Sequence, residues 1–435
     1  MKRITSILFI LMLSMGSVYA VTSVDSIRRE MKHLKGKELL RAHSNLCRLA
    51  AAQDDMAYEL RCIRDFLAEA LKQKDADAEG RARVRQLYCY YNYDKPDSIL
   101  FYLPETLKSL KKNRMWEYYY NAWSVLVERY MYEEKLQTAL VEARKMYADA
   151  HAVNSNYGLG VSSYDIGSIY QTMGSFREAE KALTESIAAL SKEEDISQLL
   201  SAYNALSETL DGLGEYGRLR ATTEKWKNVL DKYREEALRK GYTQPLNGRY
   251  LYCTLAAAVA EIETANYSKA YKLLKQAEIY AEGRKAVAQY KLLQVEARYY
   301  AATKQYAKAI ACNRKNMEII TASGDSVSLL TVQTQQADFL LKAGRYKEAA
   351  ELYNEILPHK DRLRTTELAN QLDELQWISS RYATKSSPHA SISLLLSGYC
   401  CCLPSSYTLY ICAGCTVRTE PCTTPFCNTD VCRTK

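Results

Sequence analysis

The cysteines near the C-terminus are the residues whose type and spacing could most readily do chemistry. The stretch from Ser397 to Cys415 is SGYCCCLPSSYTLYICAGC, and it ends in the CxxC pair Cys412 and Cys415. Thiolates at this spacing bind zinc in structural sites and form the reactive pair of redox proteins. The three later cysteines form no second CxxC, and no histidine lies close to them. The pattern therefore does not complete a zinc or redox site.

Two other interpretations of this segment compete with a metal or redox site. Residues 386–417 contain no Lys, Arg, Asp or Glu and are long enough to span a membrane, but they are poor in Leu and Val and are broken by Pro404. The third interpretation is a shifted reading frame. Tyr399–Cys402 must be encoded TAY TGY TGY TGY, where Y is a pyrimidine, and one base earlier the same bases give three leucine codons. We favour the shifted frame, since that frame permits an apolar span followed by a basic segment.

The rest of the sequence carries no catalytic or metal-binding motif. GxxxxGK[ST], HExxH and GxSxG are absent, and the five histidines are not spaced as paired ligands. A lone GxG at Tyr157–Gly160 follows no strand, so we interpret it as the start of a helix. Cys47 and Cys62 lie singly in helical patterns as small core residues, and a disulfide between them stays open. We predict no enzyme, no cofactor and no metal ion.

The first twenty residues have the composition of a secretory signal peptide. Lys2 and Arg3 form the charged start, Ile7–Met15 the apolar core, and Val18–Ala20 the small-residue cleavage site. We therefore predict an exported, periplasmic protein. The net charge of +8 is scattered among acidic neighbours, and together with export it gives no reason to expect a nucleic-acid partner.

Comparison of the sequence with itself reveals a repeat with a period near 40 residues. Six segments have the pattern helix, short turn, helix, with apolar residues recurring at three and four. Their turns fall at Glu134, Gly174, Gly214, Ala265, Lys304 and Gly344. One such hairpin cannot bury its own apolar face, so neighbouring hairpins must stack. The sequence predicts an all-α fold, a right-handed α-solenoid of about seven helix-turn-helix repeats.

The residues expected to pack the repeats together are small or aromatic. A small residue stands five positions after the turn in five of the six segments, and glycines at three of the turns can end a helix in the left-handed conformation. The predicted packing residues are Trp123, Tyr130, Ala139, Gly167, Tyr170, Gly174, Ala179, Gly214, Ala270, Ala309, Gly344 and Ala349.

These residues resemble the tetratricopeptide repeat family. The series Ile166-Gly167, Tyr170, Gly174, Phe176, Ala179, Leu183 follows the family's order of Leu-Gly, Tyr, Gly, Tyr, Ala, Phe. Trp123 and Tyr130 stand where the family places its Trp and Tyr. The period near 40 exceeds the family's usual 34, so the helices are expected to be about a turn longer.

The pattern divides the sequence into five parts. We predict a signal peptide at 1–20, divergent helical repeats at 21–79 and the tetratricopeptide array at 80–362. A polar exit helix, LRTTELANQLDELQ, is predicted at 363–376. Residues 377–435 form the cysteine-rich tail, which we expect to be out of frame or disordered, and therefore poorly structured.

A repeat array of this kind offers a binding surface. In such solenoids the first helices of successive hairpins line a concave groove, and a groove of polar and aromatic side chains suits a protein or peptide ligand. An ordinary solvated helix face is the alternative for each residue. The predicted groove residues are Tyr164, Ser168, Gln171, Asn204, Glu208, Asp211, Arg298 and Asp338.

The signal peptide, the repeats and the hidden frame together resemble bacterial sensor histidine kinases with periplasmic tetratricopeptide repeats. The resemblance covers about residues 1–376, and the kinase's phospho-accepting His segment and nucleotide-binding glycines are absent. It implies a non-catalytic sensing module of a two-component system, truncated near Gln376. Anchoring in the inner membrane would require a span from the tail or from the intact frame. The alternative is a secreted tetratricopeptide adaptor of envelope complexes, and homodimerisation stays open in both cases.

Overall fold

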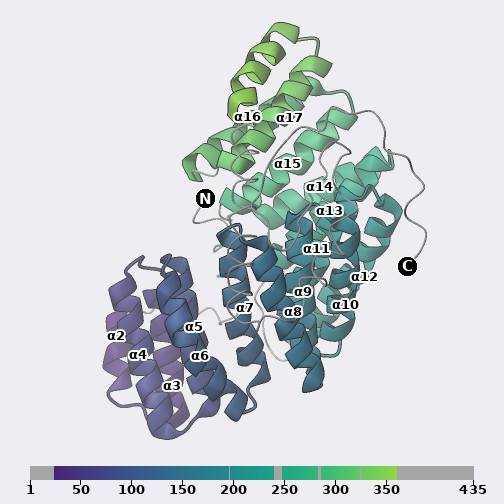
Figure 1. The fold of residues 1–435 in the computed structure, drawn as a ribbon. Coiled ribbons are helices and arrows are strands. Elements are labelled where there is room, and N and C mark those ends of the chain that lie inside the picture. The colour runs from purple at the N-terminus through teal and green to yellow at the C-terminus, as the bar shows by residue number, and fades with distance from the viewer. Residues whose placement is uncertain (1–23, 195, 240–246, 283–285, 324–325, 360–435) are drawn as a thin grey trace, which may run out of the picture. The chain divides into compact units, whose positions relative to one another are not determined.

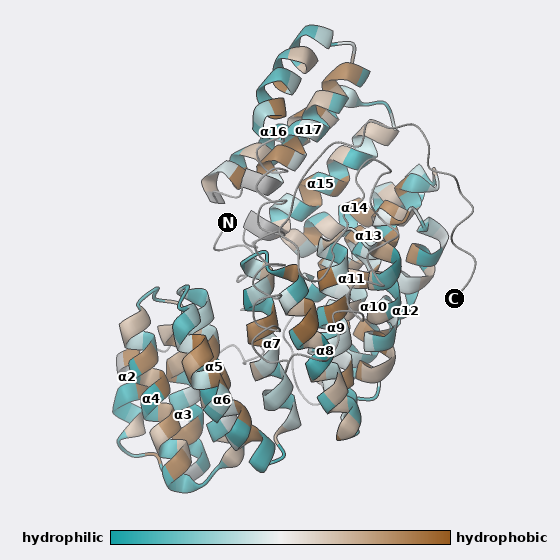
Figure 2. Cartoon of the chain, viewed as in Figure 1, coloured by the Kyte–Doolittle hydropathy of each residue, from teal (hydrophilic) through white to brown (hydrophobic). Residues whose placement is uncertain are grey.

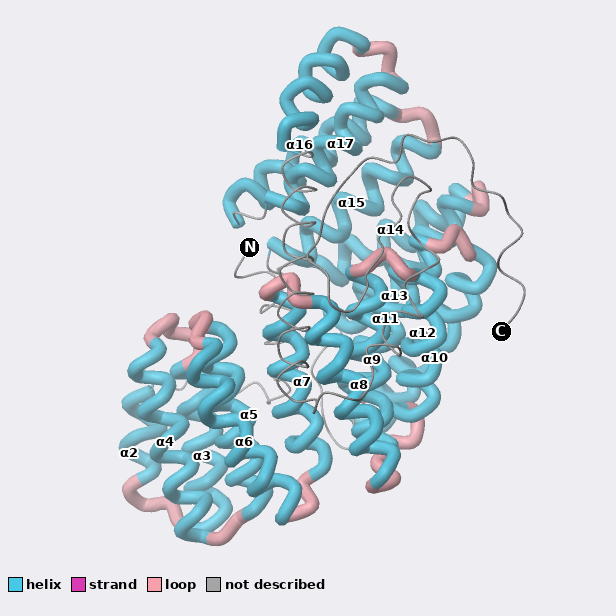
Figure 3. Tube along the Cα trace, viewed as in Figure 1, coloured by secondary structure: helices cyan, strands magenta, loops and turns pink. Residues whose placement is uncertain are grey.

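The computed structural model describes residues 24–194, 196–239, 247–282, 286–323 and 326–359 (Figure 1). The predicted signal peptide, exit helix and cysteine-rich tail lie outside these residues. Every regular element in the described ranges is a helix, as Figure 3 shows. None of the described helices combines the length and the apolar character needed to cross a membrane.

Sixteen labelled helices follow one another, and a further helix covers residues 346–359. Their bounds are α2 Val24–Met31, α3 Gly36–Ala50, α4 Met56–Gln73, α5 Ala76–Asn92, α6 Pro96–Lys112, α7 Trp116–Tyr132, α8 Leu136–Ala152, α9 Asn156–Thr172, α10 Phe176–Leu190, α11 Ser197–Gly212, α12 Tyr216–Arg239, α13 Asn247–Glu263, α14 Tyr267–Ala281, α15 Ala286–Ala302, α16 Tyr306–Ser323 and α17 Ser326–Lys342.

The helices are arranged as hairpins whose first helices stack on one another. Seven hairpins run from α5 to the helix over 346–359, which agrees with the number of repeats predicted for this part of the chain. We call α5, α7, α9, α11, α13, α15 and α17 the first helices. Each packs against its own partner helix, and from α5 to α15 each also packs against the next first helix. The described chain is therefore an all-α solenoid, as predicted.

Left-handed residues mark the turns between helices. All six turn positions expected from the sequence have positive φ, including the non-glycine residues Glu134 (60°), Ala265 (59°) and Lys304 (60°). At Gly174 (72°), the following amide of Ser175 donates 2.8 Å to the Tyr170 carbonyl, which closes the end of α9. A non-glycine residue in this conformation costs roughly 1–2 kcal/mol. The turn geometry is therefore set by stacking and not by glycine alone.

The structure adds a rhythm that the sequence comparison missed. Non-glycine residues with positive φ also stand at Asp54, Lys74, Asp94, Arg114 and Asn154. These positions and Glu134 follow one another every 20 residues, so the connections within and between hairpins have the same form in this part of the chain. The 40-residue repeat is here two nearly equal 20-residue units, each a helix of about 17 residues and a short turn.

The predicted packing residues lie where neighbouring helices meet. Five alanines of the second helices are at most 1% exposed, namely Ala139, Ala179, Ala270, Ala309 and Ala349. Gly167 is buried, and a Cβ there would stand 2.6 Å from Leu183 Cγ. Trp123 packs edge-on against Tyr119 at 5.8 Å between ring centroids. Small side chains thus let the helices approach closely.

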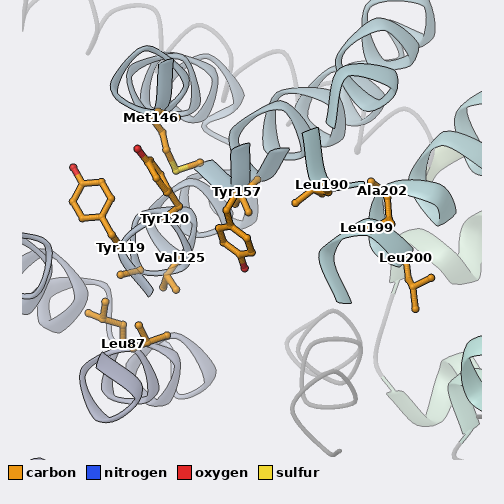
Figure 4. Close-up of a cluster of buried hydrophobic side chains, with 14 of the residues drawn as sticks. Leu87, Tyr119, Tyr120, Val125, Met146, Tyr157, Leu190, Leu199, Leu200 and Ala202 are labelled. Carbon is orange, nitrogen blue, oxygen red and sulfur yellow. The ribbon is translucent and has the colours of Figure 1, made fainter. Parts of the chain in front are cut away.

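The largest apolar core runs through α5 to α13. Figure 2 shows apolar and polar residues sharing the same helices, so each helix buries one face and exposes the other. Tyr120, Met146 and Leu190 are fully buried in this core, and Figure 4 shows them with Leu87 and Tyr157 from adjoining helices. Such burial provides the main stabilisation of a repeat array, at about 25 cal/mol per Å² of apolar surface.

The lone GxG lies at a helix start, as expected. Ser155 is the N-cap of α9, and its Oγ accepts the amide hydrogen of Gly158 at 3.0 Å. The two glycines also make room for side chains from other helices. A Cβ on Gly158 would stand 2.3 Å from the Tyr120 ring, and one on Gly160 would stand 2.4 Å from Leu190 Cγ. The motif therefore serves packing and not phosphate binding.

Candidate binding groove

A groove of about 610 Å³ crosses the first helices α11, α13, α15 and α17. We call it the central groove. It is lined by Asn204, Ser207, Glu208, Asp211, Leu219, Tyr252, Leu255, Ala256, Val259, Lys291, Gln294, Val295, Arg298, Leu330, Thr331, Thr334, Gln335 and Asp338. All but Leu219 belong to first helices, because the repeat presents the same face of each one.

Five of the eight predicted groove residues line the central groove. They are Asn204, Glu208, Asp211, Arg298 and Asp338. Glu208, Arg298 and Asp338 each stand six residues before the left-handed residue of their own hairpin. The repeat phase therefore carries side chains 40 to 90 residues apart in the sequence to one surface.

The other three predicted residues do not line this groove. Tyr164, Ser168 and Gln171 are partly buried residues of α9, one repeat before α11. Ser168 stands at the same repeat position as Glu208, six residues before Gly174. These three side chains belong to the same row of first-helix positions, but they lie outside the central groove.

The floor of the central groove is apolar. Leu255, Ala256 and Val259 come from α13, which lies between α11 and α15. Val259 occupies the position at which α11 has Glu208 and α15 has Arg298. Because α13 presents short apolar side chains here, the charged side chains of α11 and α15 can reach each other across it.

Two ion pairs cross the groove over this floor. Arg298 donates 2.8 Å from each of its two terminal nitrogens to the two carboxylate oxygens of Asp211, and its Nε donates 2.5 Å to Glu263. Lys291 Nζ lies 3.3 Å from Glu208 Oε1. Although burial opposes its charge, the hydrogen bonds to Asp211 and Glu263 raise the pKa of Arg298 above its ordinary value. These pairs tie α11 to α15, two repeats apart.

The ion pair between α11 and α15 predicts a measurable stability effect. We expect Arg298→Met to lower the free energy of unfolding by about 2 kcal/mol, because it leaves Asp211 and Glu263 partly buried without their cation. Urea unfolding of wild type, Arg298→Met, Asp211→Asn and the double variant gives the coupling energy. Arg345→Met removes an exposed pair with Glu348 and should change little. Equal effects at Arg298 and Arg345 would contradict this account.

A second polar group lies on the first helices α5, α7 and α9. We call Tyr88, Tyr91, Ser124, Glu128, Tyr164 and Asp165 the Glu128 cluster. Ser124 Oγ lies 3.0 and 2.8 Å from the two oxygens of Asp165, which is 2% exposed. Burial, and then the neighbouring charge of Glu128, raise the pKa of Asp165 well above its ordinary value. The cluster thus holds two carboxyl groups that do not favour being charged together.

Glu128 has no cation of its own. Among the described residues no hydrogen bond or ion pair to its carboxylate is found. The arginine that follows it, Arg129, is held by Asp94 and Glu133, each at 2.6 Å. Burial raises the pKa of Glu128 to about 7. Sequence reasoning missed this residue, although it stands six residues before Glu134 and so shares the repeat position of Glu208.

The raised pKa of Glu128 predicts how stability depends on pH. The folded state binds the proton more tightly than the unfolded state, so stability falls as pH rises from about 4.5 to about 7. Glu128→Gln removes this loss and should stabilise the chain by about 2 kcal/mol at pH 8 but little at pH 4.5. Thermal unfolding at several pH values measures the difference. The exposed Glu224→Gln is the control, and equal pH profiles for all three proteins would contradict the prediction.

The described cysteines are buried thiols and not reactive sites. Cys47 and Cys62 are free in the structure, as are Cys89, Cys253 and Cys312. Burial raises the pKa of Cys47 to about 12 and that of Cys312 to about 11, so their thiolates are scarce at neutral pH. Within the described ranges, no group of three or more His, Cys, Asp or Glu side chains is arranged to hold a metal ion. The terminal CxxC lies outside those ranges.

Comparison with known proteins agrees with the fold. A model of the tetratricopeptide repeat family matches residues 291–361. The apo form of the quorum sensor NprR from B. thuringiensis is 14% identical, with a TM-score of 0.50 over 77% of this chain and 91% of its own. BtubC from P. vanneervenii is 14% identical, with a TM-score of 0.37 over 60% of this chain and 97% of its own. A search of curated proteins returned no match.

The family match supports what the helices show. It falls on α15, α16, α17 and the helix that follows, where the two hairpins are complete. The likeness to NprR extends the same fold over most of the described helices. The chain is a repeat scaffold of the tetratricopeptide type, a fold whose role is interaction with other proteins.

Proposed function

We propose that this chain is a non-catalytic scaffold that binds a protein or peptide in the central groove. We further propose that it is the periplasmic sensing module of a truncated two-component histidine kinase. The observation that carries the proposal is the central groove itself, in which five residues chosen from the repeat pattern meet on three first helices. Its apolar floor and charged walls suit a chain segment that offers both apolar and polar groups.

The groove gives the sensing mechanism a physical basis. A ligand in it would contact α11, α13, α15 and α17 and so bridge four consecutive hairpins. If the ligand binds one stacking arrangement of these hairpins better than another, it shifts their equilibrium by its differential affinity. The helix over 346–359 follows α17 directly and would transmit that shift towards the C-terminal side. The quorum sensor NprR has a similar fold, which is consistent with a sensing role.

Sequencing the gene tests the sensor assignment. The read should extend through codon 376 and several hundred bases past codon 435. The proposal expects the frame one base earlier to stay open, to encode an apolar span and then to continue into a kinase core. A stop codon soon after codon 376 in that frame would contradict the kinase assignment. The chain would then be better described as a secreted adaptor of envelope complexes.

A further inference from the structure

The charged residues of the central groove are matched, whereas Glu128 is not. Glu208 pairs with Lys291, Asp211 pairs with Arg298, and Asp338 accepts a hydrogen bond from the Tyr353 hydroxyl. Glu128 stands at the same repeat position as Glu208 and Asp338, on a first helix two repeats before α11. The chain thus carries an uncompensated carboxylate on the row of positions that forms the groove.

We propose that the Glu128 cluster binds a basic side chain, lysine or arginine, of the peptide that occupies the central groove. This inference rests on the proposed function. The occupant is defined by charge complementarity, because a carboxylate in a partly buried site gains most from a cation that brings hydrogen-bond donors with it. Arg129 cannot supply that charge, since Asp94 and Glu133 engage it.

The other members of the cluster suit the same group. Tyr88, Tyr91 and Tyr164 all lie within electrostatic range of Glu128, so aromatic rings surround the carboxylate. Aromatic faces attract lysine and arginine cations by about 0.5–2 kcal/mol. Asp165 adds a second carboxyl group, which Ser124 orients. A bound cation would let both carboxyl groups ionise, which the isolated protein disfavours.

The cluster lies within reach of a ligand in the groove. Tyr164 is within electrostatic range of both Glu128 and Glu208, so it lies between the two regions. α7 packs against α9, and α9 against α11. Packed helices are about 8–10 Å apart, so the step from α7 to α11 is roughly 16–20 Å. An extended peptide covers that distance in about five or six residues. Glu128 is partly exposed and therefore accessible to the ligand.

Peptide selection from a phage-displayed dodecamer library tests this inference on the full chain. We expect the enriched peptides to share a Lys or Arg five or six residues from an apolar segment. A synthetic peptide of the enriched sequence should bind Glu128→Gln at least tenfold more weakly than wild type. Replacing its basic residue with norleucine should cause the same loss for wild type and little further loss for Glu128→Gln. Glu224→Gln, an exposed position on a second helix, should bind as wild type does.

The outcomes separate the two proposals. Enriched peptides that bind wild type and Glu128→Gln equally would overturn this inference and leave the groove function standing. The same holds if no basic residue recurs at a fixed position. If no peptide is enriched at all, the proposed function fails and this inference fails with it. Glu128→Gln is expected to fold, because it removes an unpaired carboxylate, and its circular dichroism spectrum verifies this before binding is measured.

Discussion

Replacing Gly158 with leucine is expected to lower the free energy of unfolding by about 3 kcal/mol or more. Gly158 is a buried residue in the first turn of α9, and a Cβ there would stand 2.3 Å from Cε2 of Tyr120. Tyr120 is fully buried in the largest core, and its hydroxyl donates to Asp149 at 3.2 Å. The ring cannot move aside without breaking this bond and disturbing the core. Urea unfolding followed by fluorescence measures the loss.

A second helical glycine provides the matched control. Gly217 lies in α12, and a Cβ there would meet nothing within 4 Å. We expect Gly217→Leu to be neutral or to stabilise by up to about 1 kcal/mol, since leucine favours helix more than glycine does. If Gly158→Leu were as stable as Gly217→Leu, the close approach of Tyr120 to α9 would be wrong, and so would the packing of α7 on α9.

Replacing Asn313 and Asn316 together is expected to stabilise the chain by about 3 kcal/mol. Both residues lie in α16 and are 0% exposed. Neither the oxygen nor the nitrogen of either amide has a hydrogen-bond partner among the described residues. An unsatisfied buried polar group costs about 1–3 kcal/mol. Asn313→Leu and Asn316→Met should remove this cost while filling similar volumes.

The repeat indicates which residues fit these positions. Leu183 and Leu274 stand where Asn313 stands, and Met146 stands where Asn316 stands, all fully or nearly fully buried. The midpoint of urea unfolding should rise in the double variant. Asn121→Leu serves as the control, because Asn121 accepts a hydrogen bond from Tyr157 at 2.9 Å and its loss should destabilise. Destabilisation by the α16 changes would show that these amides are satisfied in solution.

The fold was predictable because the repeat averages many weak signals. A left-handed residue at Lys304 or Ala265 is not apparent from its own type, since neither is a residue that favours positive φ. Alignment with Gly174 and Gly344 reveals it. The same alignment missed the turns at Asp94 and Arg114, because the search used the 40-residue period and not the 20-residue unit inside it.

The site was only partly predictable, for a different reason. The repeat phase placed Glu208 and Arg298 on the groove side, but it could not show which charges neutralise each other. Asp211 and Arg298 are 87 positions apart, and their contact depends on Val259 being short enough to cross. Glu128 was missed because attention fell on helices with several polar positions. Its significance comes from the lack of a neighbouring cation, which only the packed structure reveals.

Blocking the floor of the central groove tests the central claim most directly. Ala256 lies on that floor, and Ala256→Trp would fill it without adding charge. The matched control, Ala221→Trp, makes the same change at an exposed position of the second helix α12. Binding of a library-selected peptide is measured for wild type and both variants by fluorescence anisotropy. We expect at least a tenfold loss of affinity for Ala256→Trp and none for Ala221→Trp. Unchanged binding by a folded Ala256→Trp would contradict the assignment of this groove as the binding site.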